Sequence, residues 1–312
     1  MLDNSSVKAL RPAKNRTDPT RPYFWLFEEE PDGEGNLTDV QTIFLTHSEC
    51  PFKCVMCDLW KNTLDRKTPA GATPEQIRYA LGRLPPAPVV KLYNNGNFFD
   101  RKALPVEDYP AIASLLHNHK HVIVENHPKL TNDLIPRFRD LLNGTLEIAM
   151  GLETIHPDVL PALNKQMTTG LFADAAEKLL RMGISVRAFV LLNPPFLTDR
   201  EANIEWCIKS VRFAFEAGAT ACTIIPVRTG NGAMERLQKQ GDYIPPDIDA
   251  IESVFKQALD LHAGRVFLDL WELGKFMTCS ECVNLRKTRL HNMNLQQRDL
   301  PQITCRSCNS SP

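Results

Sequence analysis

The segment QTIFLTHSECPFKCVMC, residues 41–57, joins a strand-like run directly to a loop that carries three cysteines. Residues 41–46 have the β-branched and apolar side chains that are typical of a strand. Cys50, Cys54 and Cys57 follow this run with the spacing C-x3-C-x2-C. In barrels built from βα units, functional loops follow the carboxyl ends of the strands. The segment therefore predicts a βα fold whose first strand leads into a loop that does chemistry.

Strand-like and helical runs alternate from this segment to about residue 270. Further strands are predicted at residues 89–93, 121–125, 146–150, 184–192 and 221–226, with a seventh candidate at 265–270. Helices are predicted at residues 73–84, 108–116, 131–142, 157–164, 171–182, 199–217 and 247–263. Thr73, Pro74 and Gln76 fit the N-cap, N1 and N3 positions of the first helix. Such alternation predicts a parallel sheet covered by helices. Six βα units with short connections favour an α/β fold of the partial (β/α)6 TIM type over a flat sheet. Periodicity alone does not decide between the two.

Length and composition are those of an ordinary globular chain. Of its 312 residues, 43% are apolar and 23% are charged, which allows a core without disulfides. No stretch approaches the roughly eighteen apolar residues of a membrane-spanning helix. Residues 1–16 lack the apolar core of a signal peptide, so we expect a cytoplasmic protein. The 36 basic and 37 acidic side chains leave a net charge of −1, which excludes a globally basic nucleic-acid coat but not a local basic patch.

The chain is expected to have three parts. Residues 1–40 form an N-terminal extension that packs on the body through its aromatic run, residues 23–27. Residues 41–270 form the partial barrel. Residues 271–312 form a short four-cysteine metal-binding tail.

Seven of the nine cysteines fall into two groups, and in a cytoplasmic chain such spacing favours metal or cluster ligation over disulfides. In the first group, Cys50, Cys54 and Cys57 can ligate three irons of a [4Fe-4S] cluster. The fourth iron then stays open to chelate a further ligand and pass it an electron. Zinc or buried thiols are the alternatives, but three thiols without a nearby histidine complete no tetrahedral zinc set.

The second group consists of Cys279 and Cys282, then Cys305 and Cys308, with 22 residues between the two pairs. Four thiolates arranged in two such pairs can close a tetrahedral zinc site. They can also hold an auxiliary iron–sulfur cluster, and the spacing does not separate the two. The tail is short and polar and would shield a cluster poorly, which favours zinc.

The cysteine loop resembles the signature of the radical S-adenosylmethionine (SAM) superfamily. This resemblance implies a partial (β/α)6 barrel and a [4Fe-4S] cluster whose open iron binds the amino and carboxylate groups of SAM. Reduction then cleaves a C–S bond and yields a 5′-deoxyadenosyl radical that abstracts a hydrogen atom. Met56 stands where the family often has an aromatic residue, and its flexible thioether can lie against the adenine.

The same resemblance implies several further SAM contacts. Asn95, Gly96 and Asn97 match the segment that receives the methionine amino group, although an ordinary Asn-Gly turn would look alike. Glu125 and Glu153 resemble polar residues that hold the ribose or methionine moiety in the branch with coproporphyrinogen dehydrogenases and the Elongator catalytic subunit. Lys165 matches a basic position that pairs with the methionine carboxylate. Each carboxylate could instead form a strand-end salt bridge, and no catalytic side chain is assigned.

Residues 91–100, 151–154 and 193–197, together with the tail cysteines, resemble the Elongator-like group that contains the radical SAM subunit of archaeosine synthase. This implies action on a lysine adduct of 7-deazaguanine in transfer RNA, with cleavage of the lysine C–N bond. It also implies a partner subunit that installs the lysine. An electron donor such as flavodoxin or ferredoxin is expected. Radical chemistry on a small molecule or peptide is one alternative, and a non-catalytic zinc-binding scaffold is another.

Overall fold

The computed structural model describes residues 2–94 and 97–308, and its centre is one curled sheet of eight strands in sequence order. The strands are β1 Phe24–Pro31, β2 Leu37–Leu45, β3 Val89–Asn94, β4 His121–Glu125, β5 Thr145–Glu153, β6 Ser185–Leu192, β7 Ala221–Pro226 and β8 Arg265–Leu268. Strands β2 to β8 are parallel, and β1 pairs antiparallel with β2. The predicted partial TIM-type barrel is confirmed.

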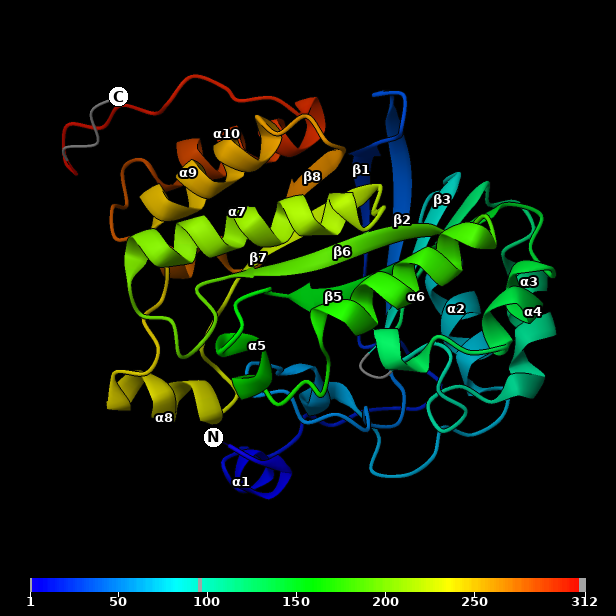
Figure 1. Cartoon of the computed structure of the whole chain (residues 1–312). Coiled ribbons are helices and arrows are strands. Elements are labelled where there is room, and N and C mark those ends of the chain that lie inside the picture. The colour runs from blue at the N-terminus through cyan, green and yellow to red at the C-terminus, as the bar shows by residue number, and fades with distance from the viewer. Residues whose placement is uncertain (1, 95–96, 309–312) are drawn as a thin grey trace.

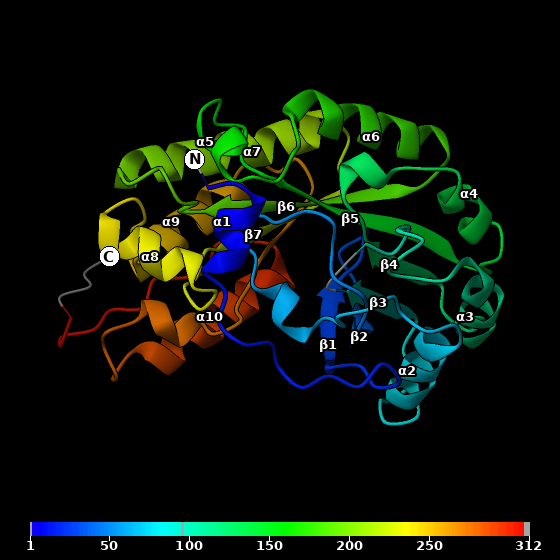
Figure 2. The same cartoon turned by 90° about the horizontal axis from the view of Figure 1, so that it is seen from below.

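The chain forms ten α-helices within the described residues, and most of them cover the outer surface of this sheet (Figure 1). They are α1 Asn4–Ala9, α2 Ala72–Leu81, α3 Tyr109–Leu115, α4 Leu134–Arg139, α5 Val159–Ala162, α6 Thr169–Arg181, α7 Arg200–Glu216, α8 Ala233–Gln240, α9 Ile248–Leu259 and α10 Val283–Gln296. Seen from below, α2, α3, α4, α6 and α7 lie outside the curve of the sheet, whereas α1 and α8 lie below it (Figure 2). Side chains with a two-residue period along the strands pack against the outer helices, as Val90 and Leu92 of β3 do.

The other face of the strands points into the barrel and carries charges near the amino ends of the strands. Arg187 of β6 pairs with Glu30 of β1 at 2.9 Å and with Glu147 of β5 at 2.7 Å. Lys91 of β3 pairs with Glu28 at 2.8 Å and also with Glu30. These side chains, which we call the inner ion cluster, satisfy one another in the barrel, where most of them are buried.

Strand β1 lies within the residues expected to form an N-terminal extension. It pairs with β2 along its whole length, from Phe24 opposite Phe44 to Pro31 opposite Leu37. Its second half reads EEEP and lacks the apolar alternation by which strands are recognised. The inward side chains of that half are Glu28 and Glu30, which are held by the charges of the inner ion cluster. Charge pairing across the barrel takes the place of the apolar pattern there.

The predicted capping of the first helix is wrong. Helix α2 has Gly71 at its N-cap, and no side-chain cap is formed there. Gln76, expected to fold back on its own helix, instead accepts a hydrogen bond from Thr46 N at 2.7 Å and donates to Thr46 O at 2.9 Å. A buried amide is more strongly stabilised by satisfying two backbone groups at the end of β2 than by a solvated cap.

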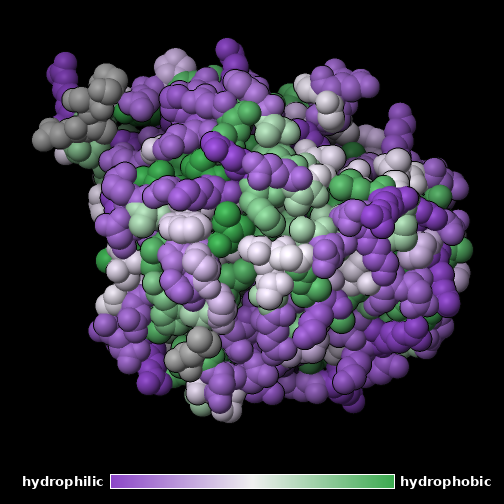
Figure 3. All heavy atoms as spheres, in the orientation of Figure 1, coloured by the Kyte–Doolittle hydropathy of each residue, from purple (hydrophilic) through white to green (hydrophobic). Residues whose placement is uncertain are grey.

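The face shown in Figure 3 presents hydrophobic residues as separate patches among hydrophilic ones. None of the helices within residues 2–94 and 97–308 combines the length and apolar character that crossing a bilayer requires.

Candidate cofactor and metal sites

The cysteine loop begins where β2 ends, and neighbouring side chains fix its direction. His47 is fully buried, and its Nε2 lies 3.1 Å from Thr73 Oγ1 at the start of α2. Burial lowers the pKa of His47 to about 3, so its ring is neutral. Ser48 N donates to Thr68 Oγ1 at 2.9 Å. The loop therefore leaves the sheet along one defined path.

Two asparagines hold the loop from the other side of the barrel. Asn231, just before α8, donates from Nδ2 to Val55 O at 2.8 Å and to Cys57 O at 3.1 Å. Asn164, after α5, donates to Lys53 O at 2.8 Å. Sequence reasoning missed both residues, because a single asparagine with no motif around it carries no signal. Their contacts join the loop to segments more than a hundred positions away along the chain.

The three loop thiols are free and are spread apart. Among the described residues, the four tail cysteines make up the one group of ligand atoms close enough together for a single ion, and Cys50, Cys54 and Cys57 are not such a group. Burial raises the pKa of the Cys54 thiol to about 12 and also raises that of Cys57. A bound cationic centre would favour the thiolates that it needs as ligands. The three loop sulfurs are thus not gathered as closely as the four tail sulfurs are.

Asn97 connects this loop to the end of β4. Its Nδ2 donates to Cys50 Sγ at 3.3 Å, and its Oδ1 accepts from His127 N at 2.7 Å. The His127 ring stacks on Phe52 of the cysteine loop with ring centroids 3.9 Å apart. The structure thus places Asn97 against a cysteine sulfur. Asn95 and Gly96, predicted to act with it, lie outside the described residues.

The end of β5 brings Glu153 and Lys165 together in a buried ion pair of 2.5 Å. Glu153 has a left-handed backbone with φ 65°, next to a register shift in the β5–β6 pairing. Gly151 leaves room for the pair, because a Cβ there would lie 2.2 Å from Glu153 Oε1 and 2.5 Å from Lys165 Nζ. Backbone strain of this kind is found where a site requires it.

Glu125 stands at the end of β4 and accepts a hydrogen bond from Asn94 N at 2.9 Å. Burial raises the pKa of this carboxyl to about 7, against the opposing effects of Asn94 and the Lys165 charge. Met56 is partly buried against an apolar cluster that includes Val7 and Leu163.

Together these groups fit a cluster with a zwitterionic ligand beside it. Three thiols, the Lys165 cation and two carboxylates lie at or beside the carboxyl ends of β2, β4 and β5, and the Glu153–Lys165 pair fills the space that Gly151 leaves. An ammonium carboxylate ligand needs one cation and nearby acceptors, which Lys165 and the two glutamates can supply.

The tail holds a second, compact four-cysteine site. The four sulfurs lie within 4.8 Å of one another, with Cys279 and Cys305 3.7 Å apart and Cys282 and Cys308 3.7 Å apart. Cys282 is at the N-cap of α10 and is buried. Four sulfurs at this spacing suit tetrahedral zinc or a small iron–sulfur cluster.

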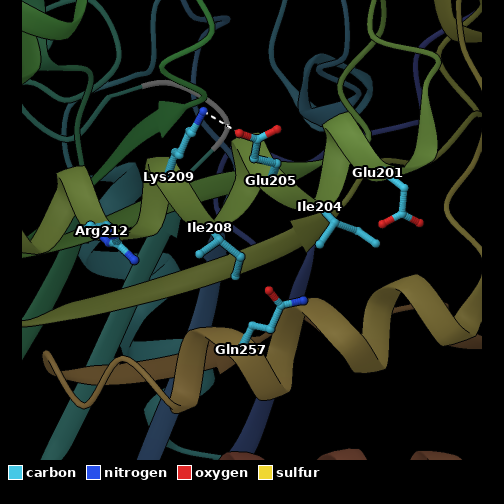
Figure 4. Close-up of a pocket in the computed structure, with 7 residues that line it drawn as sticks. All are labelled: Glu201, Ile204, Glu205, Ile208, Lys209, Arg212 and Gln257. Carbon is cyan, nitrogen blue, oxygen red and sulfur yellow. Dashed lines mark ion pairs between the residues drawn. The ribbon is translucent and has the colours of Figure 1, made fainter.

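A groove of about 470 Å³ lies on the outside of the helical layer, between α7 and α9 (Figure 4). Its lining consists of Glu201, Ile204, Glu205, Ile208, Lys209, Arg212 and Gln257. Lys209 and Glu205 pair with each other at 2.6 Å. None of the predicted site residues lines this groove, so it plays no part in the cofactor site.

Comparison with known proteins gives sequence relatives that match this chain over part of their length. No protein-family model matches the sequence. An uncharacterized protein of Methanocaldococcus jannaschii is 26% identical over 232 residues, which are 69% of this chain and 63% of that protein. The archaeosine synthase subunit beta of Methanosarcina acetivorans is 30% identical over 181 residues, which are 56% of this chain and 52% of that protein. The chain thus spans between half and two thirds of these relatives.

Among solved structures, Streptococcus suis SuiB bound to S-adenosylmethionine has a TM-score of 0.53 at 12% identity, over 74% of this chain and 49% of that one. At this identity the likeness shows the fold alone. The sequence relatives confirm the predicted resemblance to the archaeosine synthase group, and the SuiB structure confirms the fold alone.

Proposed function

We propose that this chain is a radical SAM enzyme. The observation that carries the proposal is the set of three free thiols after β2, which lies near the buried Lys165–Glu153 pair that fills the space beside Gly151. When bound, a reduced [4Fe-4S] cluster and SAM together supply a 5′-deoxyadenosyl radical that abstracts a hydrogen atom from the substrate. A zinc-binding scaffold without activity would have no use for this arrangement.

In this proposal the residues of the chain divide the work of binding. Cys50, Cys54 and Cys57 ligate the cluster, and Asn97 hydrogen-bonds to one of these sulfurs. Lys165 pairs with the methionine carboxylate of SAM, which requires that it share or exchange its partner Glu153. Burial around these groups excludes water from the charges and strengthens their interactions.

The remaining contacts to SAM are assigned on the resemblance. Glu125 and Glu153 orient the ribose or the methionine ammonium group, and Met56 lies against the adenine. Asn95 and Gly96 receive the ammonium group together with Asn97. The four tail cysteines bind zinc, for which their compact grouping is suitable, with an auxiliary cluster as the alternative. We propose three parts for the chain, which are an N-terminal extension at residues 1–40, the partial barrel at 41–270 and the four-cysteine tail at 271–312.

The substrate we propose is a lysine-adducted base in transfer RNA, with cleavage of the lysine C–N bond. The support is the sequence similarity to archaeosine synthase subunit beta. The proposal includes a partner subunit that installs the lysine and a low-potential electron donor such as flavodoxin or ferredoxin.

The first test is SAM cleavage under anaerobic conditions with a chemical reductant. Reconstituted protein should be brown, absorb broadly near about 400 nm and form 5′-deoxyadenosine. Cys54→Ala should lose both the absorbance and the product. The matched control is Cys207→Ala, which removes a buried thiol on α7 outside both cysteine groups. A Cys54→Ala protein that still cleaves SAM would contradict the proposal.

The second test addresses the substrate. Mass spectrometry of tRNA nucleosides from cells with and without this protein should show loss of one modified base. Purified protein and its partner should restore that base in tRNA from the deficient cells. Unchanged tRNA in a protein that does cleave SAM would point instead to a small-molecule or peptide substrate.

A further inference from the structure

Two exposed aromatic residues meet at the carboxyl end of the barrel. Phe24 begins β1 and Trp271 follows β8, so they belong to the two edges of the sheet. Their ring centroids lie 5.4 Å apart at an angle of 71°. Trp271 is 54% exposed and Phe24 is 38% exposed. Large apolar side chains left open to water at one place mark a binding surface.

The aromatic surface continues into the barrel. Phe24 contacts Phe44 with centroids 5.9 Å apart, Phe44 contacts Tyr93 at 6.0 Å, and Tyr93 contacts Phe189 at 6.0 Å. Tyr93 and Phe189 each stand two positions beyond a member of the inner ion cluster, and so point to the same inner face. All three inner rings are partly exposed.

Asp269 lies two residues before Trp271 and pairs with Arg228, whose guanidinium also lies 6.0 Å from the centroid of the Phe276 ring. Asp269 Oδ1 accepts from Trp271 N at 2.9 Å, and Asp269 Oδ2 accepts from Arg228 Nη2 at 2.7 Å. The side chains of Asp269 and Arg228 are 26% and 17% exposed. Among the described residues, Asp269 is the hydrogen-bond partner of the Arg228 guanidinium. Each carboxylate oxygen keeps a second lone pair, and Arg228 keeps further N–H donors.

An exposed aromatic pair with a partly exposed carboxylate two residues away along the chain suits a flat heterocycle with a hydrogen-bonding edge. Bases stack on aromatic side chains and are identified through their edges. A guanine-type edge presents N–H donors for a carboxylate and a carbonyl oxygen for a guanidinium. An aliphatic or purely apolar substrate would leave Asp269 and Arg228 without such partners.

We propose that Trp271 and Phe24 form a stacking site for a guanine-type base, whose edge pairs with Asp269 and Arg228. The inference rests on the proposed function, since it names where the substrate base is held. The stacked base lies at the carboxyl end of the sheet, at the same end as the cysteine loop. The inner rings then receive the part of the substrate that extends toward the radical.

Binding to the anaerobic holoenzyme tests this without turnover. The probes are guanosine 5′-monophosphate, cytidine 5′-monophosphate and a tRNA transcript, measured by calorimetry. Trp271→Ala and Asp269→Asn should each weaken binding of the guanine nucleotide or of the tRNA about tenfold, while the cytidine nucleotide binds weakly to every variant. Trp206→Ala, which removes a partly buried tryptophan on α7, is the matched control and should change neither.

The same measurements distinguish a base within RNA from a base in a free nucleotide. Loss of tRNA binding in the two variants places the base in RNA, and loss of nucleotide binding alone places it in a free nucleotide. Phe24→Leu should weaken binding of the same probe. A thermal melt of this variant shows whether the barrel is intact. Equal binding in all variants, or binding of no probe, overturns the inference, even if the protein cleaves SAM. Base binding without 5′-deoxyadenosine formation overturns the proposed function instead.

Discussion

At the scale of single residues, Gly151 is the position where an added methyl group has the most direct consequence for the cofactor site. The atoms that its Cβ would meet are the ends of two flexible side chains, those of Glu153 and Lys165. The backbone can therefore stay in place while the ion pair is displaced. This separates an effect on ligand binding from an effect on folding.

We predict that Gly151→Ala weakens SAM binding about tenfold, since one charge-assisted contact is lost. Its melting temperature should stay within a few degrees of wild type. Equilibrium dialysis with SAM and a thermal melt measure the two quantities. Gly170→Ala is the control, because the nearest atom to its added Cβ would be 3.9 Å away. Unchanged SAM affinity in Gly151→Ala would remove Glu153 and Lys165 from the SAM site.

Asn97 offers a second prediction, on the cluster itself. Hydrogen bonds to cluster sulfurs help to set the reduction potential. An N–H donor stabilises the reduced form of the cluster, because that form carries more negative charge. Asn97→Ala should therefore make the potential more negative, by on the order of 40 mV if the bond contributes about 1 kcal/mol. An anaerobic redox titration followed by electron paramagnetic resonance measures the shift. Asn143→Ala, which removes an exposed side chain between α4 and β5 that donates to His117 O, should leave the potential unchanged.

At the scale of elements, α10 is anchored in the core by Leu290 and Met293, whereas the segment after it has few apolar contacts. Helix α10 begins at the second tail cysteine, and the segment after it returns to bring Cys305 and Cys308 to the same place. Few apolar side chains hold that returning segment, since most residues from 301 to 308 are exposed. A metal bound by the four cysteines would therefore supply much of the folding free energy there.

Cys305→Ser should release the tail metal and leave the loop cluster in place. Metal analysis of wild-type protein is expected to give one zinc and four irons, and the variant should keep the four irons. Limited proteolysis should cut the variant between residues 296 and 308 sooner than wild type. Eight irons in wild type, falling to four in the variant, would show that the tail holds an auxiliary cluster instead of zinc.

At the scale of the whole molecule, the inner ion cluster joins the antiparallel edge strand to the parallel sheet. Arg187 contacts Glu30 and Glu147, and all three are buried or nearly so. Arg187 holds the pKa of Glu30 at about 2 and that of Glu147 well below its usual range, against the burial that opposes both shifts. Removing the arginine would leave two buried carboxylates without their main partner.

Arg187→Met should destabilise the protein by about 3–5 kcal/mol at pH 7. Because the folded-state pKa values are depressed, the ionised glutamates stabilise the fold above the unfolded value of 4.5, and this stability is lost as pH falls toward 2. The difference in the free energy of unfolding between wild type and variant should therefore become smaller at acidic pH. Urea unfolding at pH 7 and pH 3.5 measures it. Arg181→Met, which removes an exposed ion pair with Glu177, should cost under about 0.5 kcal/mol.

Local pattern was enough to predict much of this molecule. Strands β3, β4 and β7 and helix α7 were found within a few residues, because period and capping are properties of neighbouring positions, as Asp199 shows by accepting from Ala202 N. The four-cysteine site was predicted from spacing, since each pair of thiols lies within one short turn. The pattern failed at β1, where Glu28 and Glu30 are stabilised by charges on distant strands.

The amino-acid sequence alone determined that three thiols, closely spaced along the chain, follow a strand of a βα barrel and that four more form a second group between residues 279 and 308. Only the tertiary structure decided which side chains face them. Asn97 against Cys50, Asn231 against the loop carbonyls and Trp271 against Phe24 all come from separate parts of the chain. Such contacts depend on how far the sheet curls and in which register its strands pair, and no short-range pattern carries that information.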